Sequence, residues 1–249
     1  MHRHIAAALL AAAGAVAVVA AGLAGAVPAT AGPVASARPV IKTVIDTNFA
    51  GYVTAGPWRF RYVGAEVPIA KCRKTASQNA SARVALASGT INQAAHIDLL
   101  CGGGPGSVRF GTSGDENQAF RLSPRTGDVL KVNVYRDVAA CRDRFSATNT
   151  RTRRAVSVTE RTRCTVVYRH AQIGATLTHI GVRPPVRDVR LWSIRGAAMT
   201  SYNGTKGTIC GPWAAEKHLA APVIAIRMVP SALSSSCRDF SLLLKGSRS

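Results

Sequence analysis

Alternation of apolar and polar side chains, rather than a helical period, dominates this chain. The run from Ala82 to Phe110 reads as strand, turn, strand, glycine-rich turn and strand. Val129–Tyr135 alternates cleanly, and Trp58–Val67 sets an aromatic face against a basic face. Further strands are predicted at Val44–Thr54, Phe120–Leu122, Phe145–Thr148, Ala155–Thr159, Thr165–His170, Val186–Ile194, Val223–Val229 and Phe240–Leu244.

These short strands with regular turns predict an all-β protein, an antiparallel two-sheet β-sandwich or a barrel. No strand-helix-strand rhythm is present, and Pro212–Leu219 is the stretch that suits a single helical turn. A parallel α/β architecture is therefore not expected.

The amino terminus has the pattern of an export signal. Met1–His4 is basic, Ile5–Val27 is almost wholly small and apolar, and Ala29-Thr30-Ala31 fits a cleavage site. Length alone would permit a membrane span, but the small residues and the cleavage site favour removal. We therefore expect a signal peptide over 1–31, a linker over 32–40 and one domain over 41–249, with no transmembrane segment after processing and a secreted or wall-associated location.

Six cysteines follow the signal, and an even number in an exported chain predicts three disulfides. Fifteen connectivities are open to six cysteines, and we expect neighbours to pair. The expected pairs are Cys72–Cys101, Cys141–Cys164 and Cys210–Cys237. No C-x-x-C motif occurs and the histidines are not clustered with cysteines, so no metal or other cofactor is expected.

The chain is strongly basic, with 32 Lys and Arg against 12 Asp and Glu and a net charge of +20. Such a surface favours polyanions, although solubility and a GC-rich genome account for it equally well. Arginines gather on a hairpin predicted over Arg142–Arg163, where they serve either as a polyanion patch or as protection of an edge strand. The patch consists of Arg151, Arg153, Arg154, Arg161 and Arg163. Exposed aromatics are not interleaved with them, so the sequence gives no specific nucleic-acid signal.

Gln93 interrupts an apolar strand face that it shares with Ile91, Ala95 and Ile97. A primary amide there is either a hydrogen-bonded core glutamine or a group that holds a substrate carbonyl or a water. Among common catalytic motifs, neither G-x-S-x-G nor H-E-x-x-H occurs, and the histidine spacing selects no triad.

An ordered set of motifs resembles the glutamic peptidases (eqolisins), a family of exported endopeptidases that mostly act in acid. Asn48–Tyr52 is similar to the family's N-W-[AS]-G-Y, Ile91–Ala94 to [LI]-x-Q-x-G, and Thr126–Leu130 to G-D-x-[IL]. Arg163–Arg169 stands where the family has A-E-W-I-V-E, and Val186–Ile194 where it has F-x-x-V-x-F. Each motif is short, and the resemblance depends on their order from Asp46 to Leu244.

The resemblance implies a concanavalin-like jelly roll whose concave sheet forms the substrate groove. It implies that Phe49, Tyr52, Trp58 and Phe110 line this groove. In the family a glutamate activates a water as general base, and a glutamine holds that water and stabilises the oxyanion. Gln93 matches the glutamine.

No residue matches the glutamate. Ser107–Thr112, in the region expected to carry it, contains no acid, and Arg163–Arg169 has lost both family glutamates. The resemblance therefore indicates a degenerate, non-catalytic member that binds a polypeptide, a glycan or an anionic cell-wall polymer. One alternative is an active acid endopeptidase in which Asp115, Glu116 or Asp98 replaces the base; another is an unrelated β protein, such as an inhibitor or a wall component. The sequence does not indicate an oligomeric state.

Overall fold

The computed structural model describes residues 41–70, 80–89, 91–98, 107–112, 118–120, 122, 124–177, 189–223 and 226–246. The chain from Arg38 to Ser249 forms one compact unit. All sixteen elements in the described part are strands, so the all-β prediction is confirmed. Within that part there is no helix of the length and apolarity needed to cross a membrane.

The strands, in chain order, are β1 (Lys42–Asp46), β2 (Phe49–Ala55), β3 (Phe60–Pro68), β4 (Ala80–Ser88), β5 (Ile91–Asp98), β6 (Ser107–Thr112), β7 (Gln118–Phe120), β8 (Val129–Asp137), β9 (Arg142–Asn149), β10 (Ala155–Arg161), β11 (His170–Leu177), β12 (Val189–Ser201), β13 (Lys206–Gly207), β14 (Ala214–Val223), β15 (Ile226–Pro230) and β16 (Phe240–Gly246). They pair in the order β10-β9-β8-β3-β12-β16-β15-β14-β2-β11-β4-β5-β6-β7, with β1 beside β14 and β13 beside β12. Every pair is antiparallel except β1–β14.

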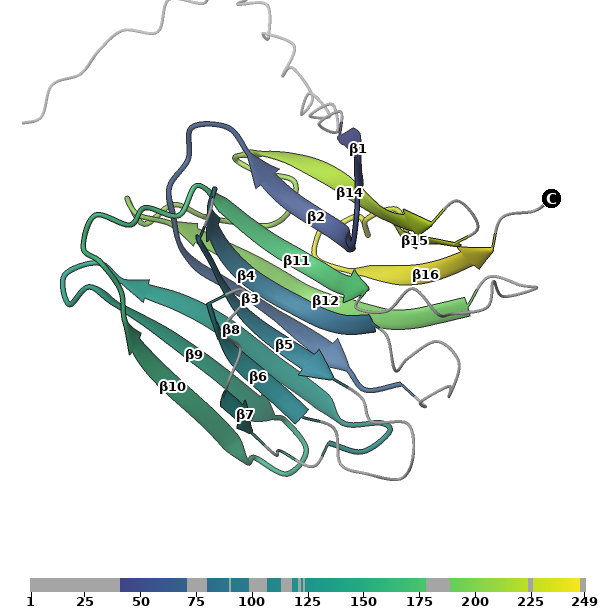
Figure 1. The fold of residues 1–249 in the computed structure, drawn as a ribbon, viewed down its shortest axis with the longest axis horizontal. Helices are drawn as coiled ribbons and strands as arrows, with labels where there is room; N and C mark the ends of the chain where they lie inside the picture. The colour runs from purple at the N-terminus through teal and green to yellow at the C-terminus, as the bar shows by residue number, and fades with distance from the viewer. Residues whose placement is uncertain are drawn as a thin grey trace, which may run out of the picture. The chain divides into compact units, whose positions relative to one another are not determined.

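The long strand β12 joins the two layers of the sandwich (Figure 1). Its first half pairs with β16 and its second half with β3, and register shifts interrupt both pairings. Such shifts bend a strand, which lets one strand serve two sheets. One layer then runs from β10 to β12, and the other runs from β12 to β7.

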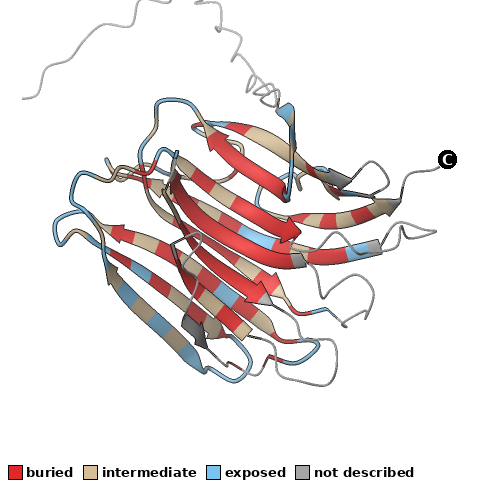
Figure 2. Cartoon of the chain, viewed as in Figure 1, coloured by how far each residue is buried: buried red, intermediate tan, exposed pale blue. Residues whose placement is uncertain are grey.

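The core lies between these layers and takes alternate residues from each strand. Val132 and Phe145 face inward from one layer, and Val84, Ile97 and Phe110 face inward from the other. The rings of Phe110 and Phe145 stack at 5.7 Å and connect the two sheets directly. Buried positions follow the central strands, while the edge strand β10 has none (Figure 2).

A buried ion pair joins the neighbouring strands β8 and β9 within one sheet. Arg136 Nη1 lies 3.3 Å from Asp143 Oδ1, and both side chains are almost completely buried. Asp143 also accepts hydrogen bonds from the Tyr168 hydroxyl, at 2.7 Å, and from Thr162. Burial, followed by the charge of Asp143, raises the pKa of Tyr168, so its hydroxyl remains a donor.

Two local predictions are wrong. Thr165–His170 is not a strand; the strand at this place in the sheet, β11, begins at His170. The preceding segment instead bridges the layers, because Tyr168 accepts from the Phe60 backbone and Arg169 donates to Ala87.

Pro212–Leu219 contains no helical turn, because β14 begins at Ala214. This strand pairs with β1 and β2 through its first half. Pairing on both sides supplies backbone partners that outweigh the helix propensity of Ala, Glu and Lys.

Two of the expected disulfides form. Cys141–Cys164 and Cys210–Cys237 have Cα separations of 4.8 Å and 5.6 Å. The third expected pair, Cys72–Cys101, lies outside the described residues.

Candidate functional site

Gln93 lies on β5 with its side chain toward the interior of the sandwich. It is 3% exposed, and its cross-strand partners are Leu86 on β4 and Thr112 on β6. Ala95 and Ile97, on the same face of β5, belong to the core. The carboxamide therefore faces the space between the sheets and not an outer surface that a polypeptide could reach.

Within its own sheet, the described strands nearest to Gln93 supply no carboxylate, whereas β9, which packs against β5 across the interior, carries Asp143 in its ion pair with Arg136. β4, β6 and β11 contain neither Asp nor Glu. Asp98 ends β5, but its side chain is outside the described part, as are Asp115 and Glu116. A general base must reach the proton that it accepts, within hydrogen-bond distance or through one water. These three strands offer no carboxylate to serve as that base.

The opposite face of the same sheet carries a polar layer. Phe49 on β2, Arg83 on β4 and His96 on β5 are all less than 9% exposed. The Arg83 guanidinium lies 5.9 Å from the centre of the Phe49 ring, and the Phe49 and His218 rings pack edge to face with their centres 6.0 Å apart. A cation over an aromatic face is an attractive contact, so these side chains hold one another in place.

His218 lies between two carboxylates at the β1–β14 end of this face. Its Nδ1 is 3.3 Å from Asp46 Oδ2 and its Nε2 is 3.5 Å from Glu216 Oε2. Burial opposes ionisation of Asp46, but hydrogen bonds from the backbone N–H of Asn48 and Phe49 and from His218 hold its pKa below the usual value. Both acids are thus engaged by His218, and they lie on β1 and β14 rather than beside β5.

Comparison with family models gives no match, and comparison with curated proteins gives none either. Solved structures do match. One is scytalido-glutamic peptidase with a transition-state analogue inhibitor, at a TM-score of 0.61 and 13% identity. Another is the same peptidase with a peptide-based transition-state analogue, at 0.58 and 12%. A third is SCP-B, a member of the eqolisin family, with the tripeptide Ala-Ile-His, at 0.57 and 12%. Each match covers 81% of this chain and 98% of the other.

The chain has the glutamic-peptidase fold. At this level of identity the likeness extends to the fold and not to catalysis. Within the glutamic-peptidase fold, Arg163–Arg169 does not form the strand expected there, and the strand that does form, β11, presents no acid either. Neither Arg163–Arg169 nor β11 therefore contains an acidic residue.

The four aromatic residues expected in a groove do not meet. Phe49 lies in the outer polar layer, while Tyr52 and Phe110 are buried on the core side. Tyr52 donates its hydroxyl to the Ser231 carbonyl at 2.7 Å, and burial raises its pKa to about 12. Tyr52 and Phe110 thus have structural positions.

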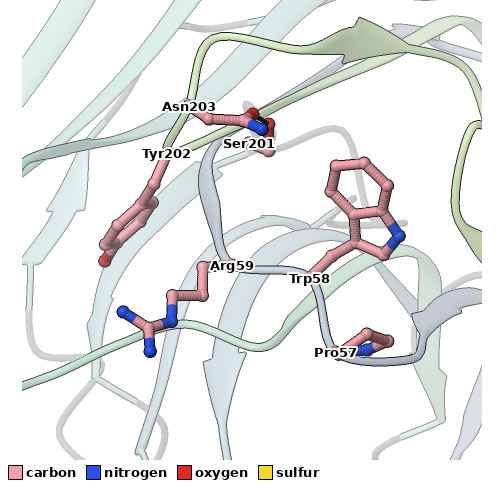
Figure 3. Close-up of a pocket in the computed structure, with 6 residues that line it drawn as sticks. All are labelled: Pro57, Trp58, Arg59, Ser201, Tyr202 and Asn203. Atoms are coloured by element: carbon pink, nitrogen blue, oxygen red, sulfur yellow. Dashed lines mark hydrogen bonds between the residues drawn. The ribbon is translucent and has the colours of Figure 1, made fainter.

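Trp58, the fourth, lines a separate pocket of about 320 Å³ (Figure 3). Its indole stands on one side, and the side chains of Arg59 and Tyr202 point to the other. The wall opposite Trp58 is the turn after β12, held to the residue that precedes β3 by the Tyr202 N–H bond to the Arg59 carbonyl at 2.8 Å. Sequence reasoning did not select Tyr202, whose only signal is its place in a turn.

The five arginines separate into two exposed groups. Arg151, Arg153 and Arg154 lie in the turn between β9 and β10. Arg161 and Arg163 lie at the other end of β10, a seven-residue strand. A strand of this length spans about 20 Å, so the hairpin does not gather the five into one patch.

Arg151 also has a structural role in its turn. Its Nε bonds to Asp128, a buried carboxylate that accepts from Asn149 Nδ2 at 2.7 Å and from the Arg125 N–H at 2.9 Å. Arg151 is the main cause that lowers the pKa of Asp128 to about 2. Asp128 belongs to the Thr126–Leu130 motif, so the aspartate of that motif anchors the adjacent hairpin.

Acid is expected to weaken the fold at Asp128. Its folded pKa is below the unfolded value of 3.8, so its stabilisation is complete above pH 4 and is lost as the pH falls toward about 2. Urea midpoints measured from pH 5 to pH 2 test this. We expect Asp128→Asn to be less stable than wild type at pH 5, with a gap that narrows in acid; a constant gap would contradict the assignment.

Proposed function

We propose that this chain is an exported, non-catalytic protein that binds an anionic polymer on a glutamic-peptidase scaffold. The inward orientation of Gln93 carries the proposal, because a 3% exposed amide between two sheets has no access to a scissile peptide bond. The absence of acids from β4, β6 and β11 supports the same conclusion.

The net charge supports binding to an anionic polymer, and the disulfides support export. A net charge of +20 favours anionic partners, and exposed arginines stand at both ends of β10. Two disulfides fit a chain that works in an oxidising compartment, outside the cytosol.

Incubation with a denatured protein at about pH 3–5, followed by mass spectrometry of new termini, tests the loss of catalysis. We expect no cleavage above the blank. The comparison variant carries Asp98→Asn, Asp115→Asn and Glu116→Gln. Cleavage by wild type that disappears in this variant, with its fold intact, would show a relocated base and reject the proposal.

Binding to an acidic polysaccharide such as polygalacturonate, measured by titration calorimetry, tests the ligand class. Counterion release should make the affinity fall steeply between about 50 and 200 mM salt. Failure to bind polygalacturonate or any other polyanion at the lower salt would remove this part of the proposal.

A further inference from the structure

We propose that the outer face of β3, β8, β9 and β10 is a binding groove for an acidic polysaccharide. This deepens the proposed function by naming a site and a ligand class, and it rests on that function. The face is hollowed by a cavity of about 550 Å³ that spans these four strands. β8, β9 and β10 lie side by side in Figure 1.

Tyr62 lines the β3 side of the groove. A Cβ added at Gly64 would be 2.9 Å from Tyr62 Cζ and nearer still to the Tyr62 hydroxyl and to Asn133 Oδ1, so the hydroxyl end of the ring lies over a position that only glycine leaves open. Tyr135 is the cross-strand partner of Tyr62. An aromatic ring held against a sheet presents its free face to a ligand, as stacking surfaces for planar or cyclic groups do.

Hydrogen-bonding groups continue across the floor. The Tyr62 hydroxyl donates to Asn133 Oδ1 at 2.7 Å, and Asn133 Nδ2 donates to Ser146 Oγ at 3.3 Å. Ser157 is the partner of Ser146 on β10, and Thr159 stands one row away on the same face. Amides and hydroxyls both donate and accept, which suits the hydroxyl groups of a sugar.

The net charge of this face is positive, with Glu66 on β3 as the cross-strand partner of Lys131. Lys131 and Arg144 line the cavity and are exposed, and Arg142 and Arg161 form the next cross-strand pair. Arg144 lies 3.5 Å from Asp137, but it is 57% exposed, and ion pairs of this kind are weak. The Arg144 guanidinium can therefore turn to a carboxylate of the ligand.

The lining favours a glycan over a polypeptide or a nucleic acid. Pockets for apolar side chains are mostly apolar, whereas tyrosine, asparagine, serine and threonine dominate here. Single-stranded nucleic acids use several successive aromatic platforms, whereas the aromatic rings here are one cross-strand pair. Carboxylates on a sugar chain match both the hydroxyl-rich floor and the flanking cations.

Matched charge variants test the site with polygalacturonate as the probe. Lys131→Gln with Arg144→Gln removes two charges from the groove, and Arg153→Gln with Arg154→Gln removes two from the β9–β10 turn. We expect the groove pair to weaken binding at least tenfold, or about 1.4 kcal/mol, and to flatten the salt dependence, while the turn pair changes affinity less than about twofold. Gly64→Ala, which changes no charge, should displace Tyr62 and weaken binding about threefold or more.

Each other outcome overturns the site. If both pairs weaken binding equally, or only the turn pair does, the polymer binds but not in the groove, and the proposed function survives without this inference. If single-stranded DNA binds as tightly as polygalacturonate with the same variant pattern, the groove is a nucleic-acid site. If a neutral glucan binds as well as polygalacturonate, the charge argument is wrong.

Circular dichroism of each variant must match wild type, and Tyr62→Phe provides a second variant that keeps the ring and removes its bond to Asn133.

Discussion

Replacing Asp143 with alanine is expected to lower the free energy of unfolding by about 3–5 kcal/mol. The carboxylate is fully buried and neutralises Arg136, whose side chain is 1% exposed. Removing the acid leaves a guanidinium charge in the core, where desolvation is expensive. It also leaves the hydroxyls of Tyr168 and Thr162 without their acceptor. Urea denaturation followed by tryptophan fluorescence measures the change.

A double variant shows whether the loss of stability comes from an unpaired buried charge or only from a missing contact. Arg136→Met with Asp143→Leu replaces the pair by apolar groups, which is often close to neutral in energy. We therefore expect the double variant to be more stable than Asp143→Ala alone. Asp137→Asn breaks an exposed pair on the neighbouring strand and should cost less than about 1 kcal/mol. A double variant that is less stable than the single one would reject this account. If Asp143→Ala does not fold, Asp143→Asn allows the same comparison.

Alternation predicted most of the sheet because it reports which face of each strand is buried. β8 and the β9–β10 hairpin lie where the pattern places them, with Val132 inward and Lys131 outward. The same logic placed Gln93 on an apolar face with Ala95 and Ile97, and the structure keeps it there. What the alternation could not give was whether the amide on that face meets other core groups or a groove open to a substrate; the structure buries it between the sheets at 3% exposure.

Other features depended on pairings between distant segments. The Arg136–Asp143 pair could not be read from the sequence, because many arginines and acids in this chain are candidates and only the register of β8 with β9 joins these two. The groove around Tyr62 needs a glycine, an asparagine and two tyrosines from separate strands. β14 was missed because two neighbouring strands override its local helix propensity.

The direction of the Gln93 face is what changes the functional interpretation. A resemblance built on motif order equates Gln93 with a substrate-facing amide, but matching letters do not fix the side of the sheet. One residue of register moves a whole strand to the other face. The shared fold therefore does not require shared chemistry: the fold needs the apolar pattern, whereas catalysis needs particular groups on a face that a substrate can reach.

Replacing Gly174 with alanine should be nearly as damaging as removing Asp143. Gly174 on β11 pairs with Gly51 on β2, and a Cβ at Gly174 would lie 2.7 Å from the Gly51 Cα and closer still to the Ala50 carbonyl. These atoms are backbone of a strand that is itself paired on its other side with β14, so they cannot move aside easily. We expect a loss of about 3 kcal/mol or more, at the upper end of overpacking costs.

A turn glycine provides the control for this substitution. Gly127 has a φ of +89° and nothing within 4 Å of an added Cβ, so Gly127→Ala should cost only the backbone term, about 1–2 kcal/mol. Thermal and urea unfolding of both variants then isolates the steric part. Equal losses of stability in the two variants would mean that β2 and β11 can move apart to make room for the Cβ. The close approach of Gly174 to Gly51, in the Asn48–Tyr52 motif, would then not explain why both strands have glycine there. A larger loss at Gly174 would instead tie that motif to strand packing, so that its presence in a sequence would report the fold and not the catalytic chemistry.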